Sequence, residues 1–199
     1  RSGSMGGLED DTIGGFNSVL QKNREQDGDA IVSTVLFDDR IEVICDREDI
    51  VDVEPITSKE YYVRGCTALL DAVGGAINHV GKVQKNLPKH HRAKNVMFVI
   101  TTDGYENASR EFTYPQVKKL IEKKRKKGWE FIFMGANIDA AAEAARMGIA
   151  ADRAATYCAD KRGTGAVYGA MADACCQMRS GAGITGSWKL NIEDDMARR

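Results

Sequence analysis

Oxygen-bearing side chains that suit a hard metal ion occur at three separated places in this sequence. Ser2 and Ser4 flank a glycine at the start of the chain, so a tight turn can aim both hydroxyls at one point. Thr67 opens a segment with helical periodicity, and Asp103 directly follows an apolar run typical of a strand. Hydroxyl and carboxylate oxygens are ligands for Mg²⁺ or Mn²⁺ and not for soft, thiolate-bound metals. These four residues are therefore candidate metal ligands.

Each candidate also has an ordinary structural role open to it. Ser2 and Ser4 suit a turn or a helix cap, because short hydroxyl side chains bond to nearby backbone groups. Thr67 suits the N-cap of its helix, and Asp103 with Gly104 is a common turn dipeptide. The candidates nevertheless occur at the ends of successive predicted elements, and this conjunction favours one shared site.

The elements predicted around these residues alternate between helices and strands. Helices are expected over 8–25, 67–87, 115–127, 139–147 and 164–178, and strands over 30–37, 41–45, 95–102, 129–134 and 153–158. The first two strands are expected to form a hairpin. The runs 95–102 and 129–134 are almost continuously apolar, as in strands covered on both faces. The predicted fold class is α/β, with a doubly wound, mostly parallel sheet and helices on both faces.

The position of the candidates relative to such a sheet is informative. Ligands of open α/β sheets bind beyond the carboxyl ends of the strands, where the strand order reverses. Asp103 follows a strand end, as this rule requires. Ser2 and Ser4 occupy the equivalent place only if a further strand precedes Arg1, so such a strand is expected.

The candidates resemble the von Willebrand factor A (vWA) domain family, in its bacterial-type intracellular form. The metal-ion-dependent adhesion site of that family reads D-x-S-x-S, followed by a distant Thr and a distant Asp. Ser2, Ser4, Thr67 and Asp103 match this pattern. The family's leading Asp would lie two residues before Ser2, ahead of Arg1. Two wider phrases are also similar, namely Gly65-x-Thr67-x-Leu69-x-Asp71-Ala72 and Thr102-Asp103-Gly104-Tyr105-Glu106-Asn107.

The resemblance implies a fold, a cofactor and a kind of partner. It implies an N-terminally truncated vWA-like domain over residues 1–179, whose first central strand belongs between 30–37 and 95–102 and is missing. It implies Mg²⁺ or Mn²⁺ at Ser2, Ser4, Thr67 and Asp103, with a coordination position open to the Asp or Glu of a protein partner. The function expected is therefore divalent-cation-dependent protein binding, without catalysis.

Two alternative functions remain open at this stage. One is a Mg²⁺-dependent enzyme acting on phosphate substrates, although the chain lacks a G-x-x-x-x-G-K-[ST] loop to cradle phosphates. No His, Lys or Cys pairs recognisably with a nucleophile at the proposed site either. The other is a metal-free structural vWA domain. Metal binding would distinguish the cation-dependent binding module from the metal-free structural domain. Nucleotide turnover would favour the enzyme.

Composition restricts the class of protein. The 199 residues suit one domain, and 28 Lys and Arg against 29 Asp and Glu argue against nucleic-acid binding. No apolar run has the roughly 20 residues of a membrane span. The five cysteines are odd in number and form no C-x-x-C pair, which predicts reduced thiols in a cytoplasmic protein.

Two further segments have ordinary interpretations. The basic run over 118–127 is expected to be a solvated helix face, because no aromatic residues interleave it as at many anion-binding surfaces. Residues 180–199 are rich in Gly and Ser and then in charges, so a flexible tail is expected there.

Overall fold

Helices and strands alternate along most of the chain, which is an α/β protein. The computed structural model describes residue 1 and residues 3–199. The helices are α1 (Glu9–Arg24), α2 (Leu69–Asn86), α3 (Tyr114–Arg125), α4 (Ala140–Arg146), α5 (Lys161–Arg179) and α6 (Leu190–Ala197). The strands are β1 (Ile31–Phe37), β2 (Ile41–Asp49), β3 (Met97–Thr102), β4 (Glu130–Ala136) and β5 (Ala154–Tyr157). Short 3₁₀ helices are η1 (Gly3–Met5), η2 (Lys89–His91), η3 (Ala151–Arg153) and η4 (Gly186–Lys189).

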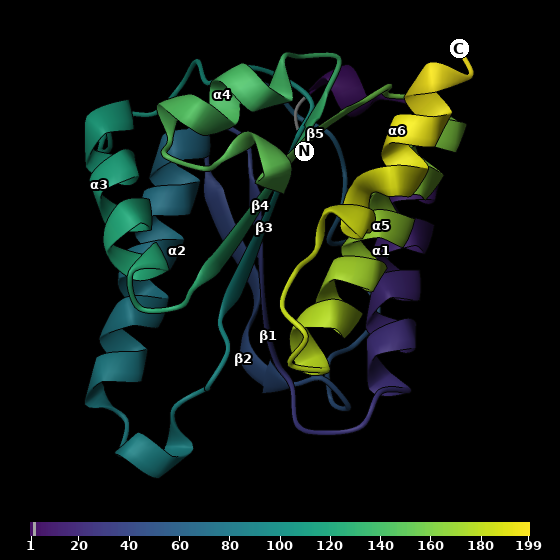
Figure 1. Ribbon diagram of the computed structural model, residues 1–199. Helices are drawn as coiled ribbons and strands as arrows, with labels where there is room; N and C mark the ends of the chain where they lie inside the picture. Colours follow the sequence, from purple (N-terminus) through teal and green to yellow (C-terminus); the bar gives the residue numbers. More distant parts are fainter. Residues whose placement is uncertain (2) are drawn as a thin grey trace.

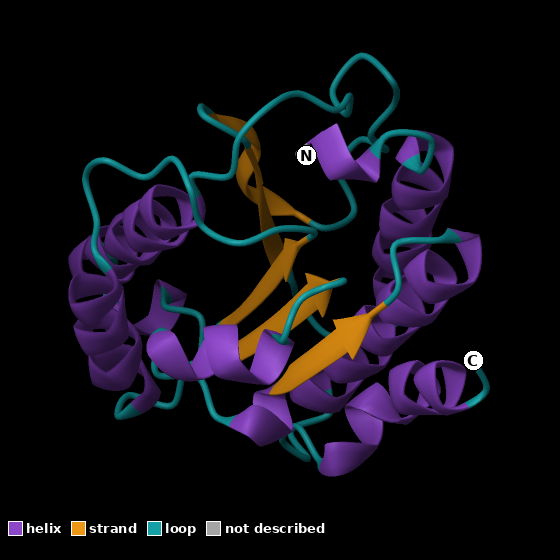
Figure 2. Cartoon of the chain, turned by 90° about the horizontal axis from the view of Figure 1, so that it is seen from above, coloured by secondary structure: helices purple, strands orange, loops and turns teal. Residues whose placement is uncertain are grey.

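The strands form two sheets. β3, β4 and β5 are parallel and lie in that order, with Thr102 opposite Gly135 at the end of the first pair. β1 and β2 form the predicted antiparallel hairpin, with Phe37 opposite Ile41. Strand β2 is longer than the predicted 41–45 because the pairing continues, past bulges, to Asp49. The sheets lie in one layer between the helices (Figure 2).

Helices lie on both sides of this layer. α2 and α3 lie on one side, and α1, α5 and α6 lie on the other (Figures 1 and 2). Strand β4 contributes side chains to the core on each side of the layer, because successive side chains of a strand point to opposite faces. Its Phe131 and Phe133 belong to the core beneath α2 and α3, and its Ile132 and Met134 belong to the core that includes α5 and α6. The apolar run 129–134 is thus covered on both faces, as predicted.

A break separates β1 from β3. Among the described residues no ladder of hydrogen bonds joins these two strands, so each has one unpaired edge. Strand β3 is also less buried than β4, since four of its six residues are only partly covered. An apolar strand with partly covered side chains and an unpaired edge is unusual inside an α/β domain.

Two expectations from the sequence are corrected by the structure. Residues 180–199 are not a flexible tail throughout: η4 and α6 form there, and Trp188 and Ile192 are buried in the core with α5. The burial of these two apolar side chains anchors the segment. Thr67 is also not the N-cap of its helix, because α2 begins at Leu69 after Ala68 and no side chain caps it.

No helix among the described residues combines the length and apolar character needed to cross a bilayer.

Candidate metal site

Ser4 and Asp103 meet, although 99 positions separate them. Ser4 lies in η1, and Asp103 is the first residue after β3. The Ser4 hydroxyl donates a hydrogen bond to Oδ2 of Asp103 over 2.5 Å. Asp103 is only 9% exposed, whereas Ser4 is exposed. The contact therefore has one side closed by protein and one side open to solvent.

Thr67 approaches the same place from the loop before α2. Its backbone N–H donates to Oδ1 of Asn107 over 2.8 Å, and the N–H of Asn107 donates to the Thr67 carbonyl over 3.0 Å. These paired bonds join the loop before α2 to the loop after β3. A Cβ added at Gly104 would lie 3.7 Å from the hydroxyl oxygen of Thr67, so this hydroxyl faces the residue next to Asp103. Three of the four candidates therefore come together, and Ser2 lies outside the described residues.

Two carboxylates hold the loop after β3 against the start of α2. Glu106 accepts hydrogen bonds from the backbone N–H of Leu70 (2.9 Å) and from the hydroxyl of Ser109 (2.7 Å). Asp71 accepts from three successive backbone N–H groups, at residues 110–112. The N–H groups at a helix start favour such negative charge. Sequence reasoning included Asp71 and Glu106 in the family-like phrases but assigned them no role.

Asp38 anchors the other flank of the site, and sequence reasoning missed it entirely. The side chains of Asp38 and Arg1 are fully buried and form an ion pair of 3.1 Å. Arg64 donates to both carboxylate oxygens of Asp38. Burial acts to raise the pKa of Asp38, but hydrogen bonds from Arg64 and from the backbone of Arg40 outweigh it and lower the pKa. This group fixes residue 1 beside the loop that leads to Thr67.

The charge of Asp103 reaches several buried groups nearby. Burial raises the pKa of Tyr61 to about 12, and the negative charge of Asp103 contributes to the increase. Burial and the same charge raise the pKa of Tyr157. Burial lowers the pKa of the Arg1 amino group, while Asp103 opposes this shift. The negative charge of Asp103 thus acts on buried groups from the N-terminus, from the segment before Thr67 and from β5.

The described donors fit a small, hard cation. Mg²⁺ binds oxygens at about 2.1 Å in an octahedron, so neighbouring ligand oxygens lie about 3 Å apart. The Ser4 and Asp103 oxygens are already near this separation, at 2.5 Å. Among the described residues, no three or more His, Cys, Asp or Glu side chains are grouped so that they could together hold a metal ion. A soft or histidine-rich metal centre is therefore not supported there, whereas a hydroxyl-based site does not require such a group.

One cavity lies away from these residues. It has a volume of about 560 Å³, and its lining includes Arg125, Trp129, Glu130 and Arg153. None of the described candidate ligands, Ser4, Thr67 and Asp103, borders it. This cavity is therefore separate from the candidate metal site.

Comparison of the chain with protein-family models, with curated proteins and with solved structures gives no match. Function must therefore be inferred from the α/β architecture and from the contacts around Ser4, Thr67 and Asp103.

Proposed function

We propose that this chain is a vWA-type binding module that uses a divalent cation to capture an Asp or Glu of a protein partner. The ligands would be Ser2, Ser4, Thr67 and Asp103, and the cation Mg²⁺ or Mn²⁺. The observation that carries the proposal is the contact between Ser4 and Asp103. It unites the two parts of the chain whose spacing resembles the vWA adhesion motif, at the carboxyl end of a parallel strand.

The break in the sheet supports the finer, doubly wound arrangement. The Arg1 amino group donates to the carbonyl of Phe37, the last residue of β1, over 3.1 Å. Ser4 reaches Asp103 at the end of β3. A strand joined to Arg1 would therefore run between β1 and β3 and end beside both. This is the central position that the resemblance to the vWA family implies.

The chemistry of the proposed site favours carboxylate capture. A bound Mg²⁺ would supply positive charge to an incoming anion. Among the candidate ligands only Asp103 is charged, so the protein neutralises little of that positive charge. The exposed position of Ser4 leaves the approach from solvent clear, and the burial of Asp103 keeps competing water from its inner side.

Binding is a better proposal than catalysis for this site. The hydroxyls of Tyr61 and Tyr157 are two of the buried titratable groups that the charge of Asp103 influences, and their pKa values are raised. They stay protonated at neutral pH and cannot act as general bases.

The five cysteines are all free, which supports the further proposal of a reducing, cytoplasmic location.

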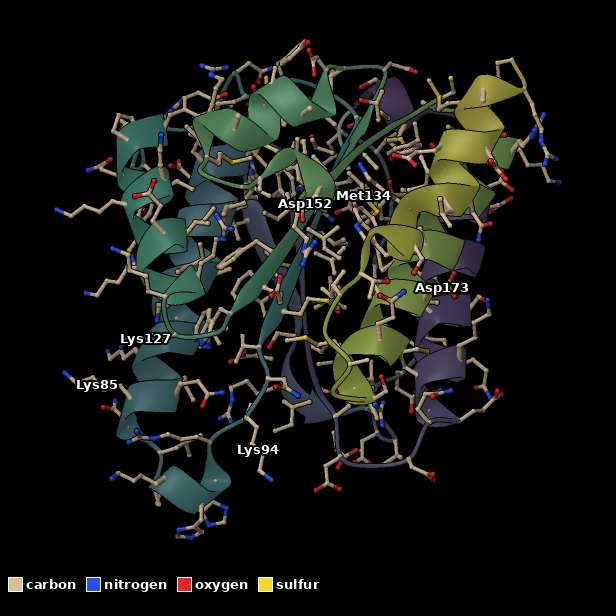
Figure 3. The ribbon with its side chains drawn as sticks, viewed as in Figure 1. Lys85, Lys94, Lys127, Met134, Asp152 and Asp173 are labelled. Carbon is tan, nitrogen blue, oxygen red and sulfur yellow. The ribbon has the colours of Figure 1, made fainter. Side chains whose placement is uncertain are left out.

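Calorimetric titration with Mn²⁺ tests the cation requirement. The unmodified chain should bind Mn²⁺, and Asp103→Ala should abolish binding while leaving the far-UV circular dichroism unchanged. Asp173→Ala is the matched control, because Asp173 is an exposed carboxylate on α5 (Figure 3). Equal Mn²⁺ affinity in all three proteins would overturn the proposed cation site.

A second measurement addresses the partner. Acidic peptides should bind in the presence of Mn²⁺ and be released by EDTA, and the same peptides with Asn and Gln in place of Asp and Glu should not bind. Peptide binding that survives EDTA would overturn carboxylate capture, even if the chain binds Mn²⁺.

A further inference from the structure

The near-neutral charge of the chain conceals a strong separation of charge. Residues 82–94 and 118–127 hold 12 of the 28 Lys and Arg and one of the 29 Asp and Glu. These two segments thus carry a formal charge of +11, and the other residues, with 16 cations and 28 carboxylates, carry −12. We call the first set the basic end; its members are Lys82, Lys85, Lys89, Arg92, Lys94, Lys118, Lys119, Lys123, Lys124, Arg125, Lys126 and Lys127.

The two segments form one surface. They belong to the carboxyl-terminal half of α2 with η2, and to α3, and these two helices pack together. The side chain of Lys124 lies against Gly81 of α2, so that a Cβ added at Gly81 would clash with the ammonium nitrogen of Lys124. Arg92 donates to the carbonyls of Lys85 and Leu87, which holds η2 against the end of α2. Figure 3 shows Lys85, Lys94 and Lys127 on this side, at the end away from the N-terminus.

The cations of the basic end have no anionic partners within the described part of the chain. None of the twelve forms an ion pair there, although eight of the other Lys and Arg residues do. All except Lys124 are exposed. Burial lowers the pKa of Lys124, and the charges of Lys127 and Lys123 lower it further. The surface therefore carries mutual repulsion that a bound polyanion would relieve.

We propose that the basic end binds the phosphate backbone of duplex nucleic acid without reading its sequence. Lysine is the dominant cation, and it contacts phosphates as a point charge. The guanidinium groups of Arg92 and Arg125 donate to the backbone carbonyls of Leu87 and Gly148. They are therefore not fully available for the bidentate hydrogen bonds by which arginine recognises guanine. No Phe, Tyr or Trp is exposed in either segment, and the exposed aromatic rings there are the imidazoles of His90 and His91, so the segments lack the large stacking platforms of single-strand binders.

An anionic membrane or an acidic protein matches the basic end less well than nucleic acid does. Stable membrane attachment through a polybasic surface needs a second, apolar anchor, and neither segment exposes a large apolar side chain. Protein interfaces are depleted in lysine, whereas lysine dominates here. The expectation that this chain avoids nucleic acid rested on its net charge. The charge distribution removes that reason, since the acidic remainder would orient the basic end toward a polyanion.

Fluorescence anisotropy with a short, labelled DNA duplex of mixed sequence tests the proposal. Binding should weaken steeply between about 50 and 200 mM salt, since each neutralised phosphate contributes about 0.9 to the slope of log K against log salt. The triple variant Lys85→Gln, Lys94→Gln, Lys127→Gln should lower that slope by up to about 2.7. Its affinity at low salt should fall about tenfold or more. A duplex of unrelated sequence should bind equally well.

The matched control is the triple variant Lys22→Gln, Lys59→Gln, Lys161→Gln, which removes three exposed lysines outside the basic end. It should retain duplex binding. Equal losses in both triple variants would overturn a localised site. Binding to phosphatidylserine vesicles or to polyglutamate, without binding to the duplex, would overturn the nucleic-acid assignment in favour of a membrane or a protein. Absence of binding to all three would leave the basic end as a solvated face. These outcomes do not depend on Mn²⁺ and are separate from the cation-dependent function.

Discussion

The hydroxyl of Ser4 lies 2.5 Å from the carboxylate of Asp103, and the two residues come from opposite sides of the broken sheet. Ser4 lies shortly after Arg1, whose amino group bonds to the end of β1, and Asp103 directly follows β3. The contact thus bridges the break between β1 and β3 at the carboxyl ends of both strands. A cation at this place would be held by segments that follow from both sides of the break, across which the described strands form no ladder of hydrogen bonds.

Hydroxyl removal should separate metal ligands from structural residues. Ser4→Ala should lower Mn²⁺ affinity about 10- to 100-fold, the loss typical of removing a group that supports a metal site. Because Ser4 is exposed, the free energy of unfolding should change by no more than about 0.5 kcal/mol. Thr67→Val should also weaken Mn²⁺ binding, since it replaces the hydroxyl with a methyl group of similar size. Calorimetric titration measures the affinity, and urea unfolding measures the stability.

Thr67→Ser is the control for the second substitution, because it keeps the hydroxyl and removes only a methyl group. It should bind Mn²⁺ like the unmodified chain. If Thr67→Ser loses as much affinity as Thr67→Val, the role of Thr67 is packing at a buried position and not ligation.

The sequence predicted the elements well where apolar periodicity is local. The runs that became β3 and β4 and the stripe of α2 are contiguous in the chain, so their patterns are visible without a structure. Asp103 was found because it ends such a run. Asp38 was not, because its role depends on Arg1 and Arg64, which lie 37 and 26 positions away. No local pattern marks a long-range ion pair.

Replacement of Asp38 should reveal the strength of this missed ion pair. Asp38→Asn removes the fully buried one of the two carboxylates that pair with the Arg1 guanidinium, the other being the partly exposed Glu42, and this should cost up to about 3–5 kcal/mol of stability at pH 7. The pKa of Asp38 is lowered in the folded state, so its stabilising effect is present above the unfolded pKa of about 3.9 and is lost as pH falls below that value. Urea unfolding between pH 7 and pH 3 measures both effects.

The matched control for this experiment is Asp52→Asn, at an exposed carboxylate that forms no ion pair with the described residues. It should change stability by less than about 0.5 kcal/mol. The difference in stability between Asp38→Asn and the unmodified chain should shrink as the pH falls from about 4 toward the lower folded-state pKa, because the unfolded chain then binds a proton at Asp38 that the folded, ion-paired carboxylate does not. A difference that does not vary with pH would contradict the ion-pair explanation.

The carboxyl-terminal segment was mispredicted from composition, and its core contacts can be tested. Trp188 is fully buried, and its indole N–H donates to the carbonyl of Asp152 over 3.0 Å. Trp188→Ala should therefore lower the free energy of unfolding by about 3–5 kcal/mol. Leu190→Ala, two residues further on at a side chain that is 53% exposed, should have little effect. Similar stabilities for the two variants would show that η4 and α6 are not part of the folded core in solution.

The last prediction concerns the unpaired edges of β1 and β3. A short extension at Arg1, rich in Val and Ile, should pair with both edges, because the Arg1 amino group already bonds to the end of β1. Each new hydrogen bond contributes about 1 kcal/mol. A domain of this size gains about 2–4 °C in Tm per kcal/mol, so two or three net kcal/mol should raise Tm by about 5–10 °C. Thermal unfolding followed by circular dichroism measures the change.

The control extension has the same length and apolar content, with Pro at alternate positions. Proline lacks the backbone N–H and cannot donate to a neighbouring strand. The Pro-containing extension should therefore leave Tm unchanged, and hydrogen exchange at the backbone N–H groups of β1 and β3 should slow only with the Val- and Ile-rich extension. Equal stabilisation by both extensions would mean that the break accepts any apolar segment. In that case the proposed central strand, and the Ser2–Ser4 turn that would follow it, would lose their structural support.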